Sequence, residues 1–349
     1  MKGIILHGGF GTRLRPFTHT MPKQLLPIAN KPMSQYCIEV LKNAGINEIA
    51  IIIGGNNSNK VKEFYGDGDK FGVKFTYIHQ ESPKGISHAI SLCDEFVQNQ
   101  KFIVFLGDNI LKQDITAIKE NFEKSESDAT ILLCEVDNPS QFGIAEIEGK
   151  TIKHISEKPK NSISNLAVIG IYFLTPKIFD IIKKLKPSWR NELEITDALQ
   201  LLLNDKGKIN FEVVTGFWKD TGTPQDIINA NKAILEDMNP IKNKGIEENV
   251  VKIGNISIGK NTILKNVKIT GPVIIGSNCD IHSNTEIGPN VSIGDNCDIS
   301  KVNINNSIIM SNCKINESEN ITNSIIAFNS QIISNSSKKY LLGENSNIN

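Results

Sequence analysis

The sequence predicts an α/β domain over residues 1–238, followed by a left-handed parallel β-helix over residues 239–349. Three observations predict this. Short apolar runs alternate with helical patterns in the first part, isoleucine recurs every six residues in the second part, and Asn239-Pro240 marks the change of pattern. A chain of 349 residues is long enough for two domains that each bury a core of their own.

Apolar segments in the first part have the length and composition of β-strands. They are residues 3–6, 48–53, 74–78, 102–106, 129–136, 170–174 and 211–214. Helical spacing occupies residues 33–44 and 85–98, and a last helix is expected from Pro224 to about Met238. Strands rich in Ile and Val that alternate with helices indicate a mostly parallel sheet covered on both faces.

The second part carries a six-residue repeat. Its members are Ile263, Ile269, Ile275, Ile281, Ile287, Ile293 and Ile299, with Asn266, Asn278, Asn284, Asn290 and Asn296 in one phase and Gly276, Gly288 and Gly294 in another. This period fits neither a helix nor a hairpin sheet. It predicts a parallel β-helix, in which each short strand points one aliphatic residue inward and then turns a corner. Asparagine and glycine suit corners because they adopt left-handed backbone angles at low cost.

The repeat slips near residues 301–306 and resumes at Ile309, Ile315, Ile321 and Ile333, with Ala327 at the missing step. Three steps make one coil in the known left-handed β-helices, so residues 18 apart, such as Cys279 and Cys297, should stack. We interpret these cysteines as small residues that fill a repeated position, not as a disulfide or metal pair. The last coil needs a cap, which we expect residues 338–349 to supply.

Composition narrows the class of function. The 38 basic and 38 acidic residues balance, which argues against a general nucleic-acid-binding protein. No apolar run approaches the ~20 residues of a membrane helix, and the N-terminus is typical of a first strand and not of a signal peptide. The six cysteines include no Cys-x-x-Cys pair. This disfavours a disulfide scaffold or zinc site and favours a cytoplasmic location.

The segment from Leu6 to Pro16 is the most informative for function. A glycine-rich turn after the first strand lets backbone N–H groups approach an anion, at the sheet edge where ligands bind. Before Glu39 the chain has no acidic residue and five basic ones, namely Lys2, Arg13, Arg15, Lys23 and Lys31. This imbalance predicts a polyphosphate ligand. Gly8-Gly9-x-Gly11 alone is equally compatible with a plain strand-to-helix turn.

Two aspartates have the setting of metal ligands. Asp108 follows an apolar strand through one glycine, and Asp220 precedes the turn Thr221-Gly222. Mg²⁺ takes one or two carboxylates together with phosphate oxygens, so the pair predicts a magnesium site. Either aspartate alone would more often be a helix cap or a turn residue.

Together these motifs resemble the sugar nucleotidyltransferase family, and within it the thymidylyltransferases that carry a hexapeptide tail. The family's opening signature is matched by residues 8–16 with Pro22-Lys23, and Gln24 is typical of the thymidylyl members. Further matches in the family's order are Gln80 with Gly85, residues 106–109, 157–159, 192–197 and 218–222. The resemblance extends over nearly all of positions 1–235, and the tail accounts for the rest.

The resemblance implies a Rossmann-like three-layer nucleotidyltransferase domain and assigns roles by position. The implied catalytic residues are Arg13, Lys23, Asp108, Lys158 and Asp220, with Asp108 and Asp220 as the Mg²⁺ ligands. Nucleotide contacts are implied for Leu6, Gly8, Gly9, Gly11, Thr12, Arg13, Lys23, Gln24, Gln80, Gly85 and Asp108, with Gln80 and Gly85 on the base. Gly143, Glu157, Val168 and Trp218 would contact the sugar, and Lys158 its phosphate.

The implied reaction is in-line attack by glucose 1-phosphate on the α-phosphorus of dTTP, which gives dTDP-glucose and pyrophosphate. The alternatives are UTP or another sugar 1-phosphate, a second acetyltransferase activity that uses His282, and a non-catalytic regulatory relative. His7 and Lys84 depart from the family pattern, where alanine and an acidic residue are usual, and put fine selectivity in doubt. We expect a homo-oligomer with the β-helix as its contact surface.

Overall fold

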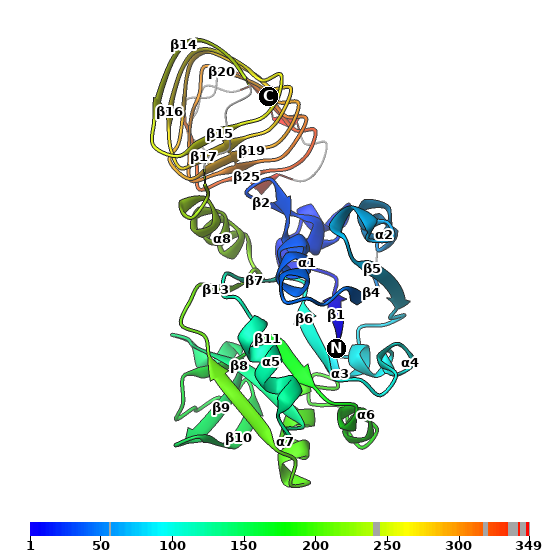
Figure 1. Ribbon diagram of the computed structural model, residues 1–349. Helices are drawn as coiled ribbons and strands as arrows, with labels where there is room; N and C mark the ends of the chain where they lie inside the picture. The colour runs from blue at the N-terminus through cyan, green and yellow to red at the C-terminus, as the bar shows by residue number, and fades with distance from the viewer. Residues whose placement is uncertain (56, 240–244, 317–319, 334–340, 343–346, 349) are drawn as a thin grey trace. The chain divides into compact units, whose positions relative to one another are not determined.

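The computed structural model describes residues 1–55, 57–239, 245–316, 320–333, 341–342 and 347–348 (Figure 1). Its contacts divide the chain into two compact units. The sheet unit comprises Met1–Phe10 and Ser34–Trp218, and the coil unit comprises Gly11–Met33 and Lys219–Asn349. The segment 11–33 therefore groups with the β-helix, while the boundary at residue 239 stays a prediction from the change of sequence pattern.

The centre of the sheet unit is a run of parallel strands in the order β6-β1-β4-β5. These are β1 (Lys2–His7), β4 (Glu48–Ile53), β5 (Lys74–His79) and β6 (Phe102–Leu106). Strands β1 and β4 are buried almost throughout. An uninterrupted apolar run is what a strand needs when both faces of its sheet are covered, and the predicted strands in this half are confirmed.

The other half of the sheet is largely antiparallel, which corrects the prediction of a mostly parallel sheet. Strand β11 (Leu166–Leu174) runs antiparallel to β6, β8 (Ala129–Glu135) and β9 (Gly143–Glu148). Strand β9 is antiparallel to β10 (Thr151–Glu157), and only β12 (Ile209–Val213) joins this half in parallel, on β8. Charged residues interrupt both β9 and β10, such as Glu146 in β9 and Lys153 in β10, so no apolar run marked them.

Helices pack around this sheet. They are α1 (Met33–Asn43), α2 (Asn59–Tyr65), α3 (Ile86–Ser91), α4 (Asp94–Val97), α5 (Thr116–Lys124), α6 (Lys177–Ile182) and α7 (Ile195–Asn204). The helix predicted over residues 85–98 is broken into α3 and α4. Helix α8 (Pro224–Glu236) of the coil unit begins as predicted, because Thr223 and Asp226 cap its first turn reciprocally. In the part of the chain that the structure describes, no helix is long and apolar enough to cross a membrane.

The C-terminal part is a parallel β-helix, as predicted. One sheet contains β14 (Ile246–Ile253), β16 (Ile263–Thr270), β18 (Asp280–Ile287), β20 (Asp298–Ser300), β21 (Asn303–Asn305), β23 (Lys314–Asn316), β24 (Asn320–Thr322), β26 (Gln331–Ile333) and β28 (Asn347–Ile348). The other contains β15 (Ile256–Ile258), β17 (Val273–Ile275), β19 (Val291–Ile293), β22 (Ile308–Ile309), β25 (Ile325–Ile326) and β27 (Leu341–Leu342). The pairings between successive strands in both sheets are parallel. Apart from β27 and β28, the predicted cap at residues 338–349 lies outside the described residues.

The coils stack at the expected interval in their middle, where Ile281 pairs with Ile299, three full steps of the repeat further along. Elsewhere the interval shortens, and three predicted inward residues are each off by one position. Leu264, Ile326 and Ile332 hold the stacked inward positions in place of Ile263, Ala327 and Ile333. The reason is that the shorter coils lack a residue or two at a corner, which shifts the inward phase.

The predicted corners are confirmed at the asparagines. Asn266, Asn278, Asn284, Asn290 and Asn296 all have positive φ, between 54° and 62°. Several also form a ladder along the coil axis: the side-chain amide of Asn261 donates to Asn278 at 3.1 Å, Asn278 to Asn296 at 3.3 Å, and Asn296 to Asn312 at 3.1 Å. Cys279, Cys297 and Cys313 are buried free thiols, as the small-residue interpretation required.

Within the coil unit, buried Asn231 of α8 joins three segments. Its Oδ1 accepts from the backbone N–H of Ala29 at 2.8 Å and from the Ser292 hydroxyl at 2.9 Å. Asn30 donates from Nδ2 to the carbonyl of Ile293 at 2.5 Å. These bonds explain why the segment 11–33, which carries Arg13 and Lys23, belongs to the same compact unit as the β-helix.

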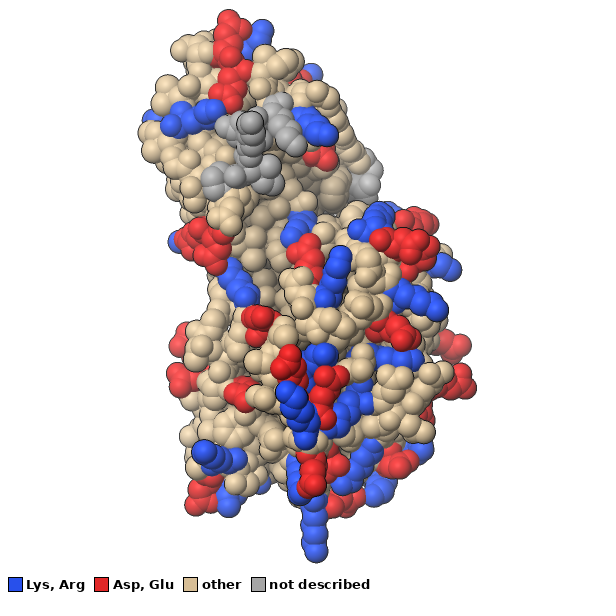
Figure 2. All heavy atoms as spheres, viewed as in Figure 1, with Lys and Arg blue, Asp and Glu red and all other residues tan. Residues whose placement is uncertain are grey.

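The visible surface of the molecule carries acidic and basic side chains interspersed over it (Figure 2).

Candidate active site

The glycine turn after β1 lies next to Gln80, at the end of β5. Gln80 is 4% exposed and its backbone N–H donates to the carbonyl of Ile53 at 2.8 Å. A methyl group added to Gly8 would come within 3.2 Å of Gln80 Oε1, so a side chain at this position would crowd the Gln80 amide. A small hollow here is lined by Gly9, Phe10, Gly54, Gly55, Gln80 and Pro83. The predicted base-reading residue thus adjoins part of the predicted phosphate loop.

Gly85 is held against the loop that precedes α7. Its φ is +100°, and an added Cβ would be 2.5 Å from the carbonyl oxygen of Leu193. Lys84 O accepts from Leu193 N at 2.8 Å, and Ser87 Oγ donates to the Glu194 carbonyl at 2.9 Å. Only glycine fits this position, because both the backbone angle and the close contact exclude a side chain.

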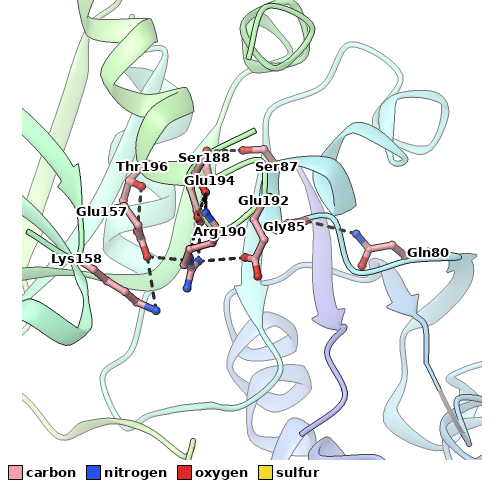
Figure 3. Close-up of polar contacts among 10 residues, drawn as sticks. All are labelled: Gln80, Gly85, Ser87, Glu157, Lys158, Ser188, Arg190, Glu192, Glu194 and Thr196. Carbon is pink, nitrogen blue, oxygen red and sulfur yellow. Dashed lines mark hydrogen bonds and ion pairs between the residues drawn. The ribbon is translucent and has the colours of Figure 1, made fainter. Parts of the chain in front are cut away.

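Glu157 lies at the centre of a cluster of polar side chains (Figure 3). Thr196 Oγ1 donates to its Oε2 at 3.0 Å, while Lys158 Nζ is 4.0 Å and Arg190 Nη2 is 3.7 Å from its Oε1. Burial raises the pKa of the Glu157 carboxyl, and the nearby carboxylate of Glu194 raises it further. The two cations and the threonine oppose this shift, and the partly buried carboxyl group of Glu157 lies beside two positive side chains.

Arg190 and Glu194 are residues that the sequence analysis missed. The Arg190 guanidinium donates to both carboxylate oxygens of Glu194, at 3.0 and 2.9 Å, and Ser188 donates to the same carboxylate at 2.8 Å. Glu194 is buried, so this bidentate pair holds the arginine in place. Glu194 was inside the matched motif at 192–197 but received no role, and nothing in the local pattern links Arg190 to Glu157.

Two other residues with predicted roles in binding the sugar phosphate, Gly143 and Lys158, adjoin Glu157. A Cβ on Gly143 would be 2.4 Å from Thr196 Cγ2 and 3.2 Å from Glu157 Oε2. Lys158 has φ +44°, an uncommon angle for a lysine, and donates its backbone N–H to Phe142 O at 3.0 Å. Val168 is buried in β11, where it pairs with β8.

Asp108 emerges at the end of β6, as predicted. Gly107 N donates to the carbonyl of Leu6 at 3.0 Å, which brings the first strand beside the aspartate turn. Asp108 Oδ1 accepts from Asn109 Nδ2 at 3.1 Å, and Asn109 Oδ1 accepts from the Trp218 indole at 2.7 Å. Asp108, Asn109 and Trp218 therefore form one chain of hydrogen bonds in the sheet unit.

The remaining predicted residues belong to the coil unit. Gly222 faces Arg13, whose Nη2 would be 2.7 Å from an added Cβ, so Arg13 lies at the turn that follows Asp220 in β13 (Trp218–Asp220). Gly11 has φ +58° and its carbonyl accepts from Thr18 Oγ1 at 2.7 Å. Two short 3₁₀ turns carry the rest: Thr12–Leu14 holds Thr12 and Arg13, and Lys23–Leu25 holds Lys23 and Gln24.

Three histidine and lysine positions raised in the sequence analysis have defined surroundings. His7 is 3% exposed and its ring meets that of Tyr65 edge-on. Lys84 is exposed beside Gly85. His282 lies at a corner of the β-helix, where Nδ1 is 3.0 Å from Ser283 Oγ and Nε2 is 3.6 Å from Asp298 Oδ1.

Two family models match the chain. The model described as Nucleotidyl transferase matches residues 2–237, and the model described as GMPPB C-terminal domain matches residues 269–349. The first model alone covers more than half of the chain and includes all the residues predicted to bind nucleotide, sugar or metal.

Individual proteins are similar over the same regions. A glucose-1-phosphate thymidylyltransferase from Streptomyces antibioticus is 38% identical over 355 aligned residues, which cover 100% of this chain and 99% of that protein. The low-salt glycan biosynthesis nucleotidyltransferase Agl11 from Haloferax volcanii is 46% identical over 75% of this chain and 73% of its own length. A crystal structure of a Bacillus anthracis protein in complex with sucrose superposes with a TM-score of 0.65 at 43% identity, over 69% of this chain and 98% of that one.

Proposed function

The chain belongs to the nucleotidyl transferase family and is a sugar nucleotidyltransferase, and on that premise we propose that it transfers a thymidylyl group from dTTP to glucose 1-phosphate. The products are dTDP-glucose and pyrophosphate. The observation that carries the proposal is the pairing of the partly buried Glu157 carboxylate with the cations Lys158 and Arg190. A sugar 1-phosphate has hydroxyl donors at one end and a dianion at the other, which is the complement of this cluster.

We assign the sugar end to Glu157 and Gly143. The carboxylate accepts hydrogen bonds from sugar hydroxyls, and Gly143 leaves room for the ring because it has no side chain. Lys158 and Arg190 bind the sugar phosphate and orient one of its oxygens for attack. The Arg190–Glu194 pair keeps the guanidinium fixed, so less conformational entropy is lost when substrate binds.

We assign the triphosphate to the glycine turn and to Arg13 and Lys23. Backbone N–H groups of Gly8, Gly9, Gly11 and Thr12 suit phosphate oxygens, since no side chain other than threonine's obstructs them. The two cations stabilise the charge that develops on the α-phosphorus and on the leaving pyrophosphate. Positioning and electrostatic stabilisation suffice for this in-line displacement, so no acid–base residue is required.

We propose Mg²⁺ as the cofactor. Asp108 and Asp220 would supply hard carboxylate oxygens. That donor set is the kind Mg²⁺ uses, in which one or two carboxylates are completed by substrate phosphates and water. When bound, Mg²⁺ would neutralise phosphate charge and favour the leaving group.

The choice of dTTP and glucose 1-phosphate is supported by the full-length similarity to the Streptomyces antibioticus thymidylyltransferase and by Gln24, which is buried. The similarity to Agl11 favours the broader class only, because its name specifies a nucleotidyltransferase of glycan synthesis and no nucleotide. UTP and other sugar 1-phosphates are therefore the alternatives to be tested against this pair. We also propose a cytoplasmic location, which the free cysteines favour, and a homo-oligomer.

Pyrophosphate release from glucose 1-phosphate and Mg²⁺ tests the proposal, with dTTP, UTP, GTP, CTP and ATP in separate reactions. We expect dTTP to give the highest kcat/KM, EDTA to abolish release, and Asp108→Asn to lower kcat by about 100-fold or more. Asp180→Asn is the control, since its carboxylate is 75% exposed on α6, and it should leave the rate unchanged.

A faster reaction with another triphosphate would keep the mechanism and change the assigned substrate. No release with any nucleotide and several sugar phosphates would refute the proposed activity. Retained activity in Asp108→Asn would show that the aspartate does not serve the reaction.

A further inference from the structure

The side-chain amide of Gln80 is held by two acceptors. Its Nε2 lies 2.9 Å from His88 Nδ1 and 3.4 Å from the carbonyl oxygen of Gly85. Figure 3 shows the nitrogen of Gln80 turned toward Gly85 and the oxygen turned away. His88 lies on α3, one turn beyond Gly85, so the helix fixes the distance between its ring and the amide.

The Gly85 carbonyl settles which end of the amide faces His88. A histidine Nδ1 either donates or accepts, and would tolerate either orientation of a glutamine. A carbonyl oxygen only accepts, so the amide group that lies next to both must be the NH₂. It follows that Nδ1 of His88 carries no proton and accepts from Gln80 Nε2. Burial lowers the pKa of His88, and the positive charge of Lys84 lowers it further, both of which favour this neutral ring.

The opposite end of the amide is thereby directed at the glycine turn. Gln80 Oε1 faces Gly8, beside the hollow that includes Gly9 and Phe10, and the residue is only 4% exposed. An amide oxygen only accepts hydrogen bonds, so in this position it suits an N–H group of a ligand in the hollow.

We propose that His88 is a positioning residue that locks the Gln80 amide with its oxygen toward the nucleobase, and so selects bases that offer an N–H at that edge. This inference rests on the proposed function, in which Gln80 reads the base. Thymine and uracil carry a proton on N3, as guanine does on N1. Cytosine N3 and adenine N1 are acceptors, and would place two acceptors face to face. The locked amide accordingly rejects cytosine and adenine nucleotides.

The sharpest test compares dUTP with dCTP, because the two differ only at positions 3 and 4 of the ring. Removing the acceptor in His88→Leu lets the amide rotate and present Nε2 to cytosine. We expect the dUTP-to-dCTP ratio of kcat/KM to fall by about tenfold or more. His88→Asn restores an acceptor near the position of Nδ1 and should keep the ratio within about threefold of the unmodified protein.

His79→Leu is the matched control. His79 is the exposed residue that precedes Gln80, so it is a sequence neighbour without the contact to the amide, and the ratio should not change. Thermal unfolding of each variant shows whether it is folded. An equal loss of kcat/KM for both nucleotides in His88→Leu would mean that His88 is only structural, and would overturn the inference while leaving the proposed activity intact. The inference is equally overturned if His88→Asn behaves like His88→Leu.

Two measurements do not depend on turnover. The ratio of the dissociation constants for dUTP and dCTP, measured by calorimetry, should change in the variants as the kinetic ratio does. In protein labelled with ¹⁵N-histidine, the nitrogen chemical shifts of His88 should report a neutral ring protonated on Nε2. A ring protonated on Nδ1 at neutral pH would overturn the inference even in an active enzyme.

Discussion

The sheet unit and the coil unit differ in which strands pair with each other. In the sheet unit Gly3 of β1 pairs with both Ile49 and Ile103, so neighbours in space come from distant parts of the chain. In the coil unit Ile299 pairs with Ile281 of the preceding coil and with Ile315 of the following one. A repeat specifies both the strand and its partner, whereas an isolated apolar run specifies only the strand.

The same difference separates their functions. Long-range contacts of the sheet unit, such as Thr196 with Glu157 and Ser87 with Glu194, bring side chains of different chemistry to one place. The β-helix of the coil unit stacks like residues on like residues, in ladders of asparagine, cysteine and isoleucine. Substitutions in the sheet unit should therefore affect function at a distance in sequence, while substitutions in the β-helix should affect stability coil by coil.

The largest effect is expected at Gly85. Gly85→Ala combines a φ of +100° with a Cβ 2.5 Å from the backbone of Leu193, so the loop that carries Arg190 and Glu194 must move. We expect a loss of about 3 kcal/mol or more in unfolding free energy, together with a higher KM for the nucleotide. Gly149→Ala, which has φ +61° but no atom within 4 Å of the added Cβ, should cost only about 1 kcal/mol. Denaturant titration of both variants measures this, and equal losses would show that contact with Leu193 is unimportant.

Next in size is the test of the inward phase of the coil. Ile281→Ala removes a fully buried side chain between Leu264 and Ile299 and should lower the unfolding free energy by about 3 kcal/mol. Ile333→Ala should change it by less than about 0.5 kcal/mol, because that side chain is 46% exposed although the simple repeat places it inside. Equal losses of unfolding free energy in the two variants would contradict the assignment of Ile281 as an inward residue and Ile333 as an outward one.

Substitutions in the asparagine ladder measure separately how much the backbone angle and the side-chain hydrogen bonds contribute to stability. Asn278 combines φ +57° with amide bonds to Asn261 and Asn296. Asn278→Ala loses both contributions and should cost about 2 kcal/mol, while Asn278→Gly keeps the backbone angle and should cost about 1 kcal/mol. Thermal unfolding of the full chain measures the loss of stability in each variant. If the glycine variant is as unstable as the alanine variant, the whole effect comes from the hydrogen bonds of the ladder.

The smallest expected effect is a gain in stability, on substitution of Glu157. The pKa of Glu157 is raised in the folded state, so its carboxylate ionises less readily there than in the unfolded chain. Its contribution to stability is therefore lost as the pH rises through the folded-state pKa. Glu157→Gln keeps the acceptor for Thr196 and should raise the Tm slightly at pH 7.5, with no difference at pH 4, while kcat/KM falls. Glu148→Gln is the control, because the hydrogen bond to Lys153 lowers the pKa of Glu148 and its removal should not stabilise the protein.

Much of this architecture follows from local patterns in the sequence. The parallel strands β1, β4, β5 and β6 are apolar along their length because both faces are buried, and each was predicted within a residue or two. The strands β9 and β10 were missed because charged residues, such as Glu146 and Lys153, interrupt their apolar signal. The motif residues of the site were assigned through resemblance, and their roles in binding and catalysis stay predictions until the activity assays are done.

By itself, the sequence determined the two kinds of architecture, the corner asparagines and the residue types available for phosphate and metal chemistry, because each is encoded within a few neighbouring positions. Only the tertiary structure decided which strands run antiparallel, where the coil shortens, and that Arg190, Glu194 and His88 stand beside Glu157 and Gln80. Those facts depend on segments far apart in the chain or on the loss of one residue at a corner. They are determined by loop closure and packing, and neither can be recognised from a few neighbouring residues in the sequence.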